Sequence, residues 1–271
     1  MRYGRYKNEL DYSYALGMAP VIELINRCPE RVLAIYAHPG YRAESGESIF
    51  SICEKNGLKC DINQKIFNIA AAKENTYVIG VFRKEWAQLA HGRPHVVFVN
   101  PGDAGNLGSN MRTCLGFGFR DVAIINPGAD ALSPRSVRAS MGAAFHITFA
   151  GYDSFDEYAA AFPEYSKYFF SPDGEMELDA AAAIINGSAA PDFDDVAAAI
   201  INGSAAASIC GGRYSLIFGN EATGLPKDLL RYGRGVRIAH SGDIDSLNLS
   251  VAVGIAANAF YKLPGFNHDK I

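Results

Sequence analysis

Ile217-Phe-Gly-Asn-Glu-Ala-Thr-Gly-Leu225 is the stretch around which this chain is organised. The apolar run at residues 214–218 predicts a buried strand, and the turn residue Gly219 ends it abruptly. Small and polar residues then continue to the leucine at the end of the stretch. This pattern is typical of a loop at the carboxyl end of a buried strand.

A second stretch, Ser246-Leu-Asn-Leu-Ser250, predicts the start of a helix. Ser246 is a favourable N-cap, and apolar residues continue from there to Phe260. Before it, residues 236–239 predict a short strand that leads into a polar loop at residues 240–245. Two strand ends and a helix N-terminus would therefore meet where α/β proteins bind ligands. Two ordinary loops of an α/β domain would show the same local pattern.

An earlier segment, residues 100–113 with the sequence Asn-Pro-Gly-Asp-Ala-Gly-Asn-Leu-Gly-Ser-Asn-Met-Arg-Thr, lies between predicted strands at 96–99 and 121–125. With the two later stretches it resembles the three motifs of the SpoU/TrmH family of RNA ribose 2'-O-methyltransferases. Residues 133–146 also look like the family's link between the first two motifs. The matching positions over residues 95–262 are Asn106 and Arg112 in the first motif, Gly219, Glu221, Gly224 and Leu225 in the second, and Ser246, Leu247 and Asn248 in the third.

The resemblance implies an α/β catalytic domain with a mainly parallel sheet, a trefoil knot, a homodimer and a pocket for S-adenosyl-L-methionine. Knots are rare exceptions to the usual connection rules, so the pattern of elements alone would not predict one. By the family's pattern, Gly219, Ile238 and Leu247 would contact the cofactor mostly through their backbones. Leu225 and the start of the last helix would line the adenine.

The resemblance also assigns catalytic roles. Arg112 is the leading candidate for activating the ribose hydroxyl. A guanidinium is a poor base, because its pKa lies above about 12, so we favour contact with a substrate phosphate and the developing alkoxide. Proton acceptance by Arg112 remains the alternative. Asn106 and Asn248 would orient the arginine or the ribose, Ser246 would cap the helix and contact substrate, and Glu221 would hold an arginine through two hydrogen bonds.

Two residues depart from the common family pattern. Ala222 stands where many members have glycine, which would narrow the loop slightly. His240 stands where methionine is common and would lie beside the cofactor. A histidine that titrates there would make activity depend on pH, and a simple change of size is the alternative.

The N-terminal part predicts a separate small α/β domain. A helix at residues 10–27 is followed by strands and helices in alternation up to a strand at 77–82. The polar, Gly/Pro-bearing segment at 88–95 predicts the boundary, giving domains at 1–88 and 95–271. The first looks like the RNA-binding domain that many family members carry, and a domain that only stabilises a dimer is the alternative.

Net charge alone argues against a nucleic-acid partner, since it is −4. The acids are concentrated, however, because residues 153–195 hold eleven acidic residues and one basic residue. The rest of the chain carries 24 basic against 18 acidic residues. Arg135 and Arg138, on a predicted helix, are our candidates for RNA binding, although a charge cluster is also typical of a solvated surface.

The five cysteines form no Cys-x-x-Cys pair, so we expect reduced thiols, no metal site and a cytoplasmic protein. No apolar run approaches the length of a membrane span. There is no dinucleotide-binding or P-loop glycine motif. The decapeptide at residues 181–190 recurs identically at 197–206, which predicts two short alanine-rich helices without an assigned function.

The sequence therefore predicts a homodimeric enzyme that methylates a ribose 2'-hydroxyl in structured RNA. Ribosomal RNA is favoured over transfer RNA because the first domain looks like that of the ribosomal enzymes. The alternatives are a transfer-RNA methyltransferase, a non-catalytic RNA-binding or ribosome-assembly factor, and a methyltransferase that acts on a small molecule.

Overall fold

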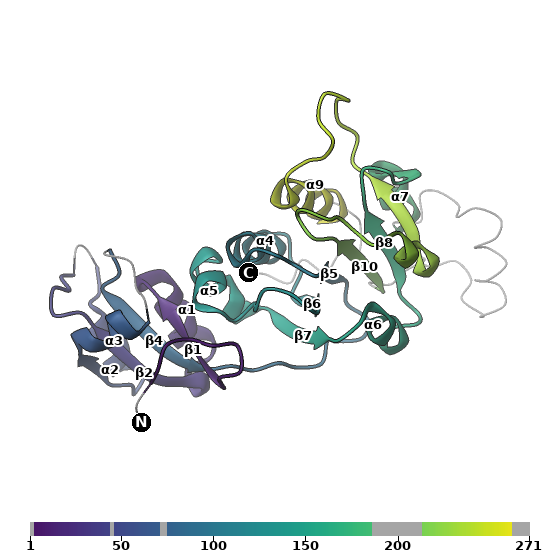
Figure 1. Ribbon diagram of the computed structural model, residues 1–271. Helices are drawn as coiled ribbons and strands as arrows, with labels where there is room; N and C mark the ends of the chain where they lie inside the picture. The colour runs from purple at the N-terminus through teal and green to yellow at the C-terminus, as the bar shows by residue number, and fades with distance from the viewer. Residues whose placement is uncertain (1–2, 44–45, 71–74, 186–212, 262–271) are drawn as a thin grey trace. The chain divides into compact units, whose positions relative to one another are not determined.

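The computed structural model describes residues 3–43, 46–70, 75–185 and 213–261 (Figure 1). Contacts divide the chain into two compact units. The first comprises Met1–Trp86, Asp103–Arg112 and Ala129–Ile147, and the second comprises Ala87–Gly102, Thr113–Gly128 and Thr148–Ile271. This division differs from a single cut at residues 88–95, because two segments of the predicted catalytic domain pack with the N-terminal unit.

The first unit is built on a four-stranded sheet in the order β1-β4-β2-β3. β4 pairs antiparallel with both β1 and β2, and β3 pairs parallel with β2. The strands are β1 (Tyr12–Leu16), β2 (Val32–Ala37), β3 (Cys60–Ile62) and β4 (Val78–Arg83), and the helices between them are α1 (Met18–Arg27), η1 (Pro29–Arg31), α2 (Ile49–Lys55) and α3 (Gln64–Ile69).

The helix predicted at residues 10–27 is wrong in its first half. Residues 12–16 form β1, and the helix α1 begins only at Met18. Gly17 separates the two with φ of 103°, a backbone conformation that favours glycine. The alternating tyrosines of β1 also suit a strand better than a helix, since Tyr14 is fully buried and Tyr12 is only partly buried.

The segment Ala129–Ile147 joins the first unit through polar and apolar contacts. It contains α5 (Pro134–Ala139), which packs against β1, and η2 (Ala143–His146), which packs against α1. Lys84 and Asp130 form an ion pair in which each side chain is only 7% exposed. A buried ion pair requires both partners, so this pair ties the segment to the end of β4.

The second unit is built on a seven-stranded sheet in which all neighbouring strands are parallel. This confirms the predicted parallel sheet. The chain runs outward from β5 through β6 and β7 on one side, and β10 lies between β5 and β8 on the other. The strand order is β7 (Thr148–Tyr152), β6 (Asp121–Ile125), β5 (His95–Val99), β10 (Tyr214–Phe218), β8 (Ser166–Phe170), β11 (Arg234–Arg237) and β9 (Met176–Glu177).

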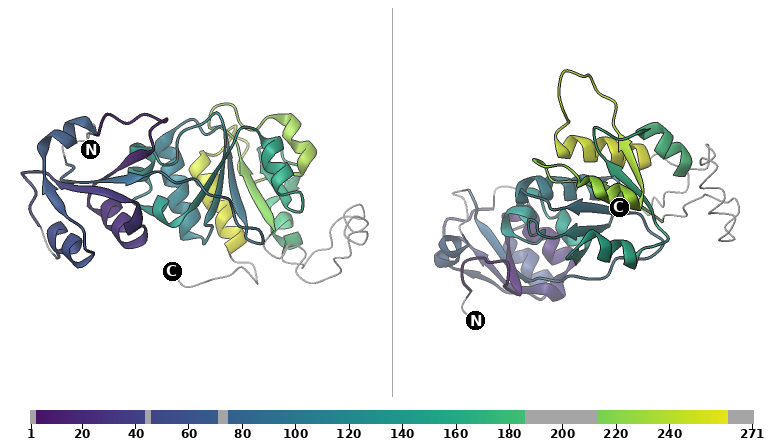
Figure 2. Two further views of the ribbon diagram at one scale, coloured as in Figure 1. Left: turned by 90° about the horizontal axis from the view of Figure 1, so that it is seen from below. Right: turned by 45° about the vertical axis from the view of Figure 1, so that its right-hand side comes forward.

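Helices cover both faces of this sheet, because successive side chains of a strand point to opposite faces. α6 (Phe155–Ala161) packs against the face that presents Val97 and Ile217. α9 (Leu249–Tyr261), the yellow helix of Figure 2, packs on the other face, where Phe260 contacts Tyr168 and Tyr214. The remaining helices are α4 (Ala104–Gly116), which both units share, α7 (Leu178–Ile185) and η3 (Lys227–Tyr232).

The repeated decapeptide lies mostly outside the described residues. Its first copy begins within α7, and the second copy at 197–206 is not described. In the described part of the chain, no helix combines the length and apolarity needed to cross a membrane.

Candidate active site

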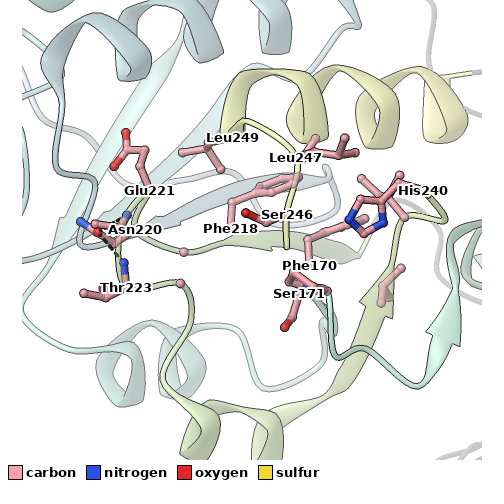
Figure 3. A pocket seen from close by; sticks show the side chains of 17 residues that line it. Phe170, Ser171, Phe218, Asn220, Glu221, Thr223, His240, Ser246, Leu247 and Leu249 are labelled. Carbon is pink, nitrogen blue, oxygen red and sulfur yellow. Dashed lines mark hydrogen bonds between the residues drawn. The ribbon is translucent and has the colours of Figure 1, made fainter. Parts of the chain in front are cut away.

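A pocket of about 320 Å³ opens at the carboxyl ends of β8, β10 and β11 (Figure 3). It lies where β10 is inserted into the strand order, and the carboxyl ends of parallel strands are the usual ligand sites of such sheets. It is lined by Phe170, Ser171, Pro172, Phe218, Gly219, Asn220, Glu221, Ala222, Thr223, Gly224, Val236, Ile238, His240, Ser246, Leu247, Leu249 and Ala252.

The loop after β10 is shaped by Asn220. Its backbone N–H donates to Gly224 O at 3.2 Å, and Gly224 N–H donates to Asn220 O at 2.9 Å. The Oδ1 of Asn220 accepts hydrogen bonds from the backbone N–H groups of Ala222 and Thr223, at 2.8 and 3.1 Å. Asn220 was not among the predicted site residues, although asparagine is a typical residue for fixing a turn through its own side chain.

The backbone conformation of this loop requires glycine at two positions, 219 and 224. A Cβ on Gly219 would lie 2.4 Å from the backbone carbon of Gly224, which no real Cβ tolerates. Gly224 adopts φ of 68°, which favours glycine. The close approach at Gly219 is therefore made by the loop's own backbone, and contact with a cofactor at Gly219 stays a prediction.

The same loop is tied to the end of β5. The Nδ2 of Asn220 donates to Asn100 O at 2.7 Å, and the backbone N–H of Gly102 donates to the Oε2 of Glu221 at 3.0 Å. These bonds join the first and second motifs through backbone groups. The predicted contact of Glu221 with an arginine stays a prediction, and the Gly102 bond adds a role for this carboxylate that the sequence did not suggest.

Three phenylalanines stack on one another, and two of them, Phe170 and Phe218, line the pocket. The rings of Phe170 and Phe218 have centroids 4.7 Å apart and planes 13° apart, and Phe98 stacks on Phe218 at 6.1 Å. They come from three adjacent strands. Phe170 was missed because residues 166–170 were not recognised as a strand, although the apolar run ends in Ser-Pro-Asp-Gly, a typical turn signal.

The third motif is placed at the pocket, but its helix begins later than predicted. α9 begins at Leu249, and the Oδ1 of Asn248 accepts a hydrogen bond from Ser250 N–H at 2.9 Å. Asn248 therefore caps the helix, and the prediction that Ser246 is the cap was wrong. The orienting role of Asn248 stays a prediction, and Ser246 and Leu247 line the pocket.

Ile238 and His240 also line the pocket, as do Leu249 and Ala252 at the start of α9. Leu225 does not belong to the lining. It packs against the core cluster on the face of the sheet that α6 covers. The predicted contact of Leu225 with the adenine stays a prediction, and its packing against the core holds the loop in place.

The first motif forms the start of α4. The Oδ1 of Asp103 accepts hydrogen bonds from Gly105 and Asn106 N–H, both at 2.8 Å, and so caps the helix. The Asn106 N–H and the guanidinium of Arg135 hold the pKa of Asp103 below its ordinary value. Asn106 and Arg112 both lie on α4 in the first unit, and the Arg112 side chain is exposed. The pocket residues all belong to the second unit.

The two arginines predicted to bind RNA lie on α5, and each has a protein partner elsewhere in the first unit. The Nη2 of Arg135 lies 2.7 Å from the Oδ2 of Asp103, and the side chain is still 71% exposed. The Nη1 of Arg138 donates to the Oγ1 of Thr76 at 3.2 Å. Arg135 is thus accessible to a phosphate, whereas Arg138 is partly buried and helps to hold α5 in the first unit.

The pocket is electrically asymmetric. Among its lining residues, which the structure describes completely, Glu221 is the one with a formal charge at neutral pH. No lysine or arginine belongs to that lining, so a phosphate bound there would lack a cationic side chain. No group of three or more His, Cys, Asp or Glu side chains suited to a metal ion occurs within the described residues. The lining instead combines apolar walls, backbone groups and one anion.

Known protein structures share the overall fold of this chain. An AdoMet-bound rRNA methyltransferase from Sinorhizobium meliloti matches with 22% identity and a TM-score of 0.67, over 92% of this chain and 86% of that one. The SpoU methyltransferase AviRb from Streptomyces viridochromogenes, in complex with AdoMet, matches with 16% identity and a TM-score of 0.67, over 93% of this chain and 90% of that one. Among curated proteins, no sequence matches the chain. Residues 93–258 match the SpoU rRNA Methylase family, which covers more than half of the chain, and the protein therefore belongs to that family.

Proposed function

We propose that this protein transfers a methyl group from S-adenosyl-L-methionine to a ribose 2'-hydroxyl of structured RNA, with ribosomal RNA as the favoured substrate. Family membership supports an RNA methylase. The assignment of the cofactor is supported by the pocket at the end of β10, which has apolar walls and a single anionic side chain.

The lining fits this cofactor better than a phosphorylated nucleotide. The adenosine part is an uncharged, largely flat group that suits Phe170, Ile238 and Leu247. The sulfonium and ammonium groups are cations, for which Glu221 is a suitable partner. A nucleotide phosphate would need cationic side chains or a glycine-rich phosphate loop, and the lining has no such cation.

When bound, the cofactor supplies an electrophilic methyl group. The 2'-oxygen forms a new bond to the methyl carbon as the carbon–sulfur bond breaks, the sulfur keeps the electron pair, and the hydroxyl proton passes to a base. The protein must hold the two reacting atoms in line at about 3 Å, and such orientation contributes roughly 7–11 kcal/mol in favourable cases. The rigid loop held by Asn220 supplies a fixed wall for this purpose.

Arg112 is our candidate for acting on the hydroxyl. Its exposed position on α4 leaves its guanidinium available to a substrate phosphate and to the developing negative charge on the oxygen. The hydroxyl proton would then leave to water. Asn106, on the same helix, and Ser246, at the pocket, complete the set of proposed polar contacts to substrate.

The preference for ribosomal RNA rests on the N-terminal sheet and on the description of the family. The knotted connection and the homodimer that the family implies belong to the same proposal. RNA binding is assigned in part to Arg135, because its guanidinium is mostly exposed. Such binding would weaken as salt is raised, since each phosphate contact releases counterions.

The test is methyl transfer from radiolabelled cofactor to total RNA that is then separated by size. The wild type should label one RNA class, and Arg112→Ala should lose this label while keeping most of its RNA affinity. Arg5→Ala, at an exposed position outside the three motifs, serves as the control and should label normally.

If only transfer RNA were labelled, transfer RNA would replace ribosomal RNA as the favoured substrate. Absence of label together with salt-sensitive RNA binding would instead favour a non-catalytic RNA-binding factor. A protein that transfers methyl groups but shows no salt-dependent RNA binding would act on a small molecule. Absence of cofactor binding would overturn the proposed activity.

A further inference from the structure

Asp103 makes two kinds of contact at the start of α4. Its Oδ1 accepts hydrogen bonds from the backbone N–H groups of Gly105 and Asn106, and its Oδ2 lies 2.7 Å from the Nη2 of Arg135 on α5. One carboxylate therefore fixes both the first turn of a helix and an arginine side chain of the neighbouring helix. Capping uses only one of the two oxygens, so the contact with the arginine needs a separate explanation.

The guanidinium of Arg135 lies close to the first turn of α4. A Cβ on Gly105 would be 3.4 Å from both the Nε and the Nη2 of this arginine, and 2.9 Å from the Oδ1 of Asp103. Glycine at this position therefore leaves room for the ion pair. The next residue of the same turn is Asn106, which we propose as a substrate contact.

A backbone contact holds the two helices in a fixed register. A Cβ on Gly108 would lie 2.4 Å from Ser136 O and 2.6 Å from the Cβ of Ala139, so α5 packs onto α4 where the side chain is missing. This contact lies about one turn after Gly105 on α4, and it immediately follows Arg135 on α5. The position of Arg135 relative to α4 is therefore set by the backbone as well as by Asp103.

Arg135 keeps most of its hydrogen-bonding capacity for a ligand. A guanidinium carries five N–H donors in one plane, and this side chain is 71% exposed although Asp103 holds one of its nitrogens. A guanidinium that is held on one side presents its remaining donors in a fixed direction, which suits the oxygens of a phosphate. Because an exposed ion pair adds little to stability, orientation of the arginine explains the pair better than the fold does.

We propose that Asp103 is a positioning residue, which holds Arg135 so that its guanidinium contacts an RNA phosphate beside the ribose that is methylated. This rests on the proposed function, in which Asn106 contacts the substrate. Each ribose within an RNA chain has a phosphate on either side, so a ribose bound near Asn106 brings a phosphate towards the neighbouring arginine. Asp103 was not among the predicted site residues.

The positioning role can be separated from the capping role. Asparagine is as favourable an N-cap as aspartate, and its amide oxygen can still accept from Gly105 and Asn106. It has no charge with which to hold a guanidinium. Asp103→Asn should therefore leave the midpoint of thermal unfolding nearly unchanged and alter only the binding of RNA.

The experiment measures methyl transfer by the full chain to the RNA class that the wild type labels, beginning with ribosomal RNA freed of protein. The variants are Asp103→Asn, Arg135→Ala and the double variant. Arg27→Ala is the control, because it removes an exposed arginine on α1 in the same unit. Initial rates give kcat and the KM for RNA. Filter binding at several salt concentrations reports phosphate contacts, and thermal unfolding reports the fold.

Arg135→Ala should raise the KM for RNA roughly five- to tenfold at about 0.1 M salt, which is the contribution of one phosphate contact. Its kcat should stay within about twofold of the wild type, because a binding contact is lost and not a catalytic one. The salt slope of RNA binding should fall by about 0.7–0.9.

Asp103→Asn should raise the KM by a smaller factor, roughly two- to fourfold, since the guanidinium remains but is no longer held. The double variant should match Arg135→Ala, because Asp103 acts through the arginine. Arg27→Ala should match the wild type in KM and in kcat.

A KM for Asp103→Asn at or below the wild-type value would overturn the inference, because the carboxylate would then only cap α4 or repel RNA. Additive effects in the double variant would also overturn it, since the two residues would act independently. An unchanged KM in Arg135→Ala would contradict the phosphate contact. In these three cases labelling by the wild type would still support the proposed function, whereas a wild type that labels no RNA would refute both.

Discussion

The backbone N–H of Gly102 donates a hydrogen bond of 3.0 Å to the Oε2 of Glu221, and so joins the loop after β5 to the loop after β10. The carboxylate is held in place by a backbone group while it remains the one formal charge in the pocket lining. We therefore expect Glu221 to attract a cationic ligand through its charge, in addition to joining the two loops through its hydrogen bond.

Replacing Glu221 by Gln should separate these two roles. An amide oxygen can still accept the Gly102 bond, but the negative charge is gone. Calorimetry should show a roughly fivefold weaker affinity for S-adenosylmethionine, a cation, because a solvent-accessible ion pair contributes about 1 kcal/mol. Affinity for the thioether product, which keeps the ammonium group but lacks the sulfonium charge, should change less if Glu221 acts on the sulfonium. Equal losses for both ligands would assign the charge of Glu221 to the ammonium group, and no loss for either would show that the charge does not contribute.

Asn220→Asp should destabilise the protein through the loop it organises. The substitution keeps an oxygen for Ala222 and Thr223 but places a carboxylate oxygen against the carbonyl of Asn100. We expect the free energy of unfolding to fall by about 1–3 kcal/mol, because a partly buried hydrogen bond is lost and two oxygen atoms are brought together. Urea denaturation measures this, and Asn26→Asp, at an exposed position on α1, should cost much less. A comparable loss in both variants would contradict the role of Asn220.

The cap assignment can be tested with a matched pair of alanine variants. Asn248→Ala removes the side chain that accepts the Ser250 N–H, and we expect it to lower the free energy of unfolding by about 1 kcal/mol. Ser246→Ala should have little effect on stability, since Ser246 lies outside α9. If Ser246→Ala proved the more destabilising of the two, the helix would be capped as the sequence first suggested.

Stability should fall on acidification because of His95. Burial lowers the pKa of this fully buried histidine to about 4. Its Nε2 donates to Ala90 O at 3.1 Å, which leaves Nδ1 to accept from the Tyr158 hydroxyl at 3.0 Å. The unfolded histidine takes up a proton below about pH 6.5, whereas the folded one resists protonation down to about pH 4.

Stability that is present above pH 6.5 is therefore lost as pH falls towards 4, by an amount on the order of 2–3 kcal/mol. Urea denaturation at several pH values measures this slope. His95→Gln should be less stable at neutral pH but should show a flatter dependence between pH 6.5 and 4. An equally steep slope in this variant would assign the effect to other groups.

Local patterns predicted the strands of the second unit well, because buried parallel strands appear as short apolar runs that end at turn residues. Residues 96–99, 121–125 and 214–218 all lie within observed strands. The error at residues 10–27 arose where Gly17 divides a strand from a helix within one apolar stretch. The insertion of β10 between β5 and β8 depends on tertiary packing, which a local sequence pattern cannot predict.

The pocket residues that belong to the sequence motifs could be predicted, whereas those that strands distant in the chain contribute could not. Glu221, Ile238, His240, Ser246 and Leu247 were singled out and line it. Phe170 reaches it because β8 pairs with β10, a relationship that only the folded sheet defines. The same holds for the bond between Asn220 and Asn100, whose residues are far apart in the chain.

Ribose 2'-O-methylation is tested by the chemical position of the transferred methyl group. RNA labelled by the wild-type protein is hydrolysed in alkali, which requires a free 2'-hydroxyl to cleave the chain. We predict that the label appears in alkali-resistant dinucleotides and that Arg112→Ala abolishes it. Label recovered in mononucleotides would place the methyl group on a base and would contradict ribose 2'-O-methylation.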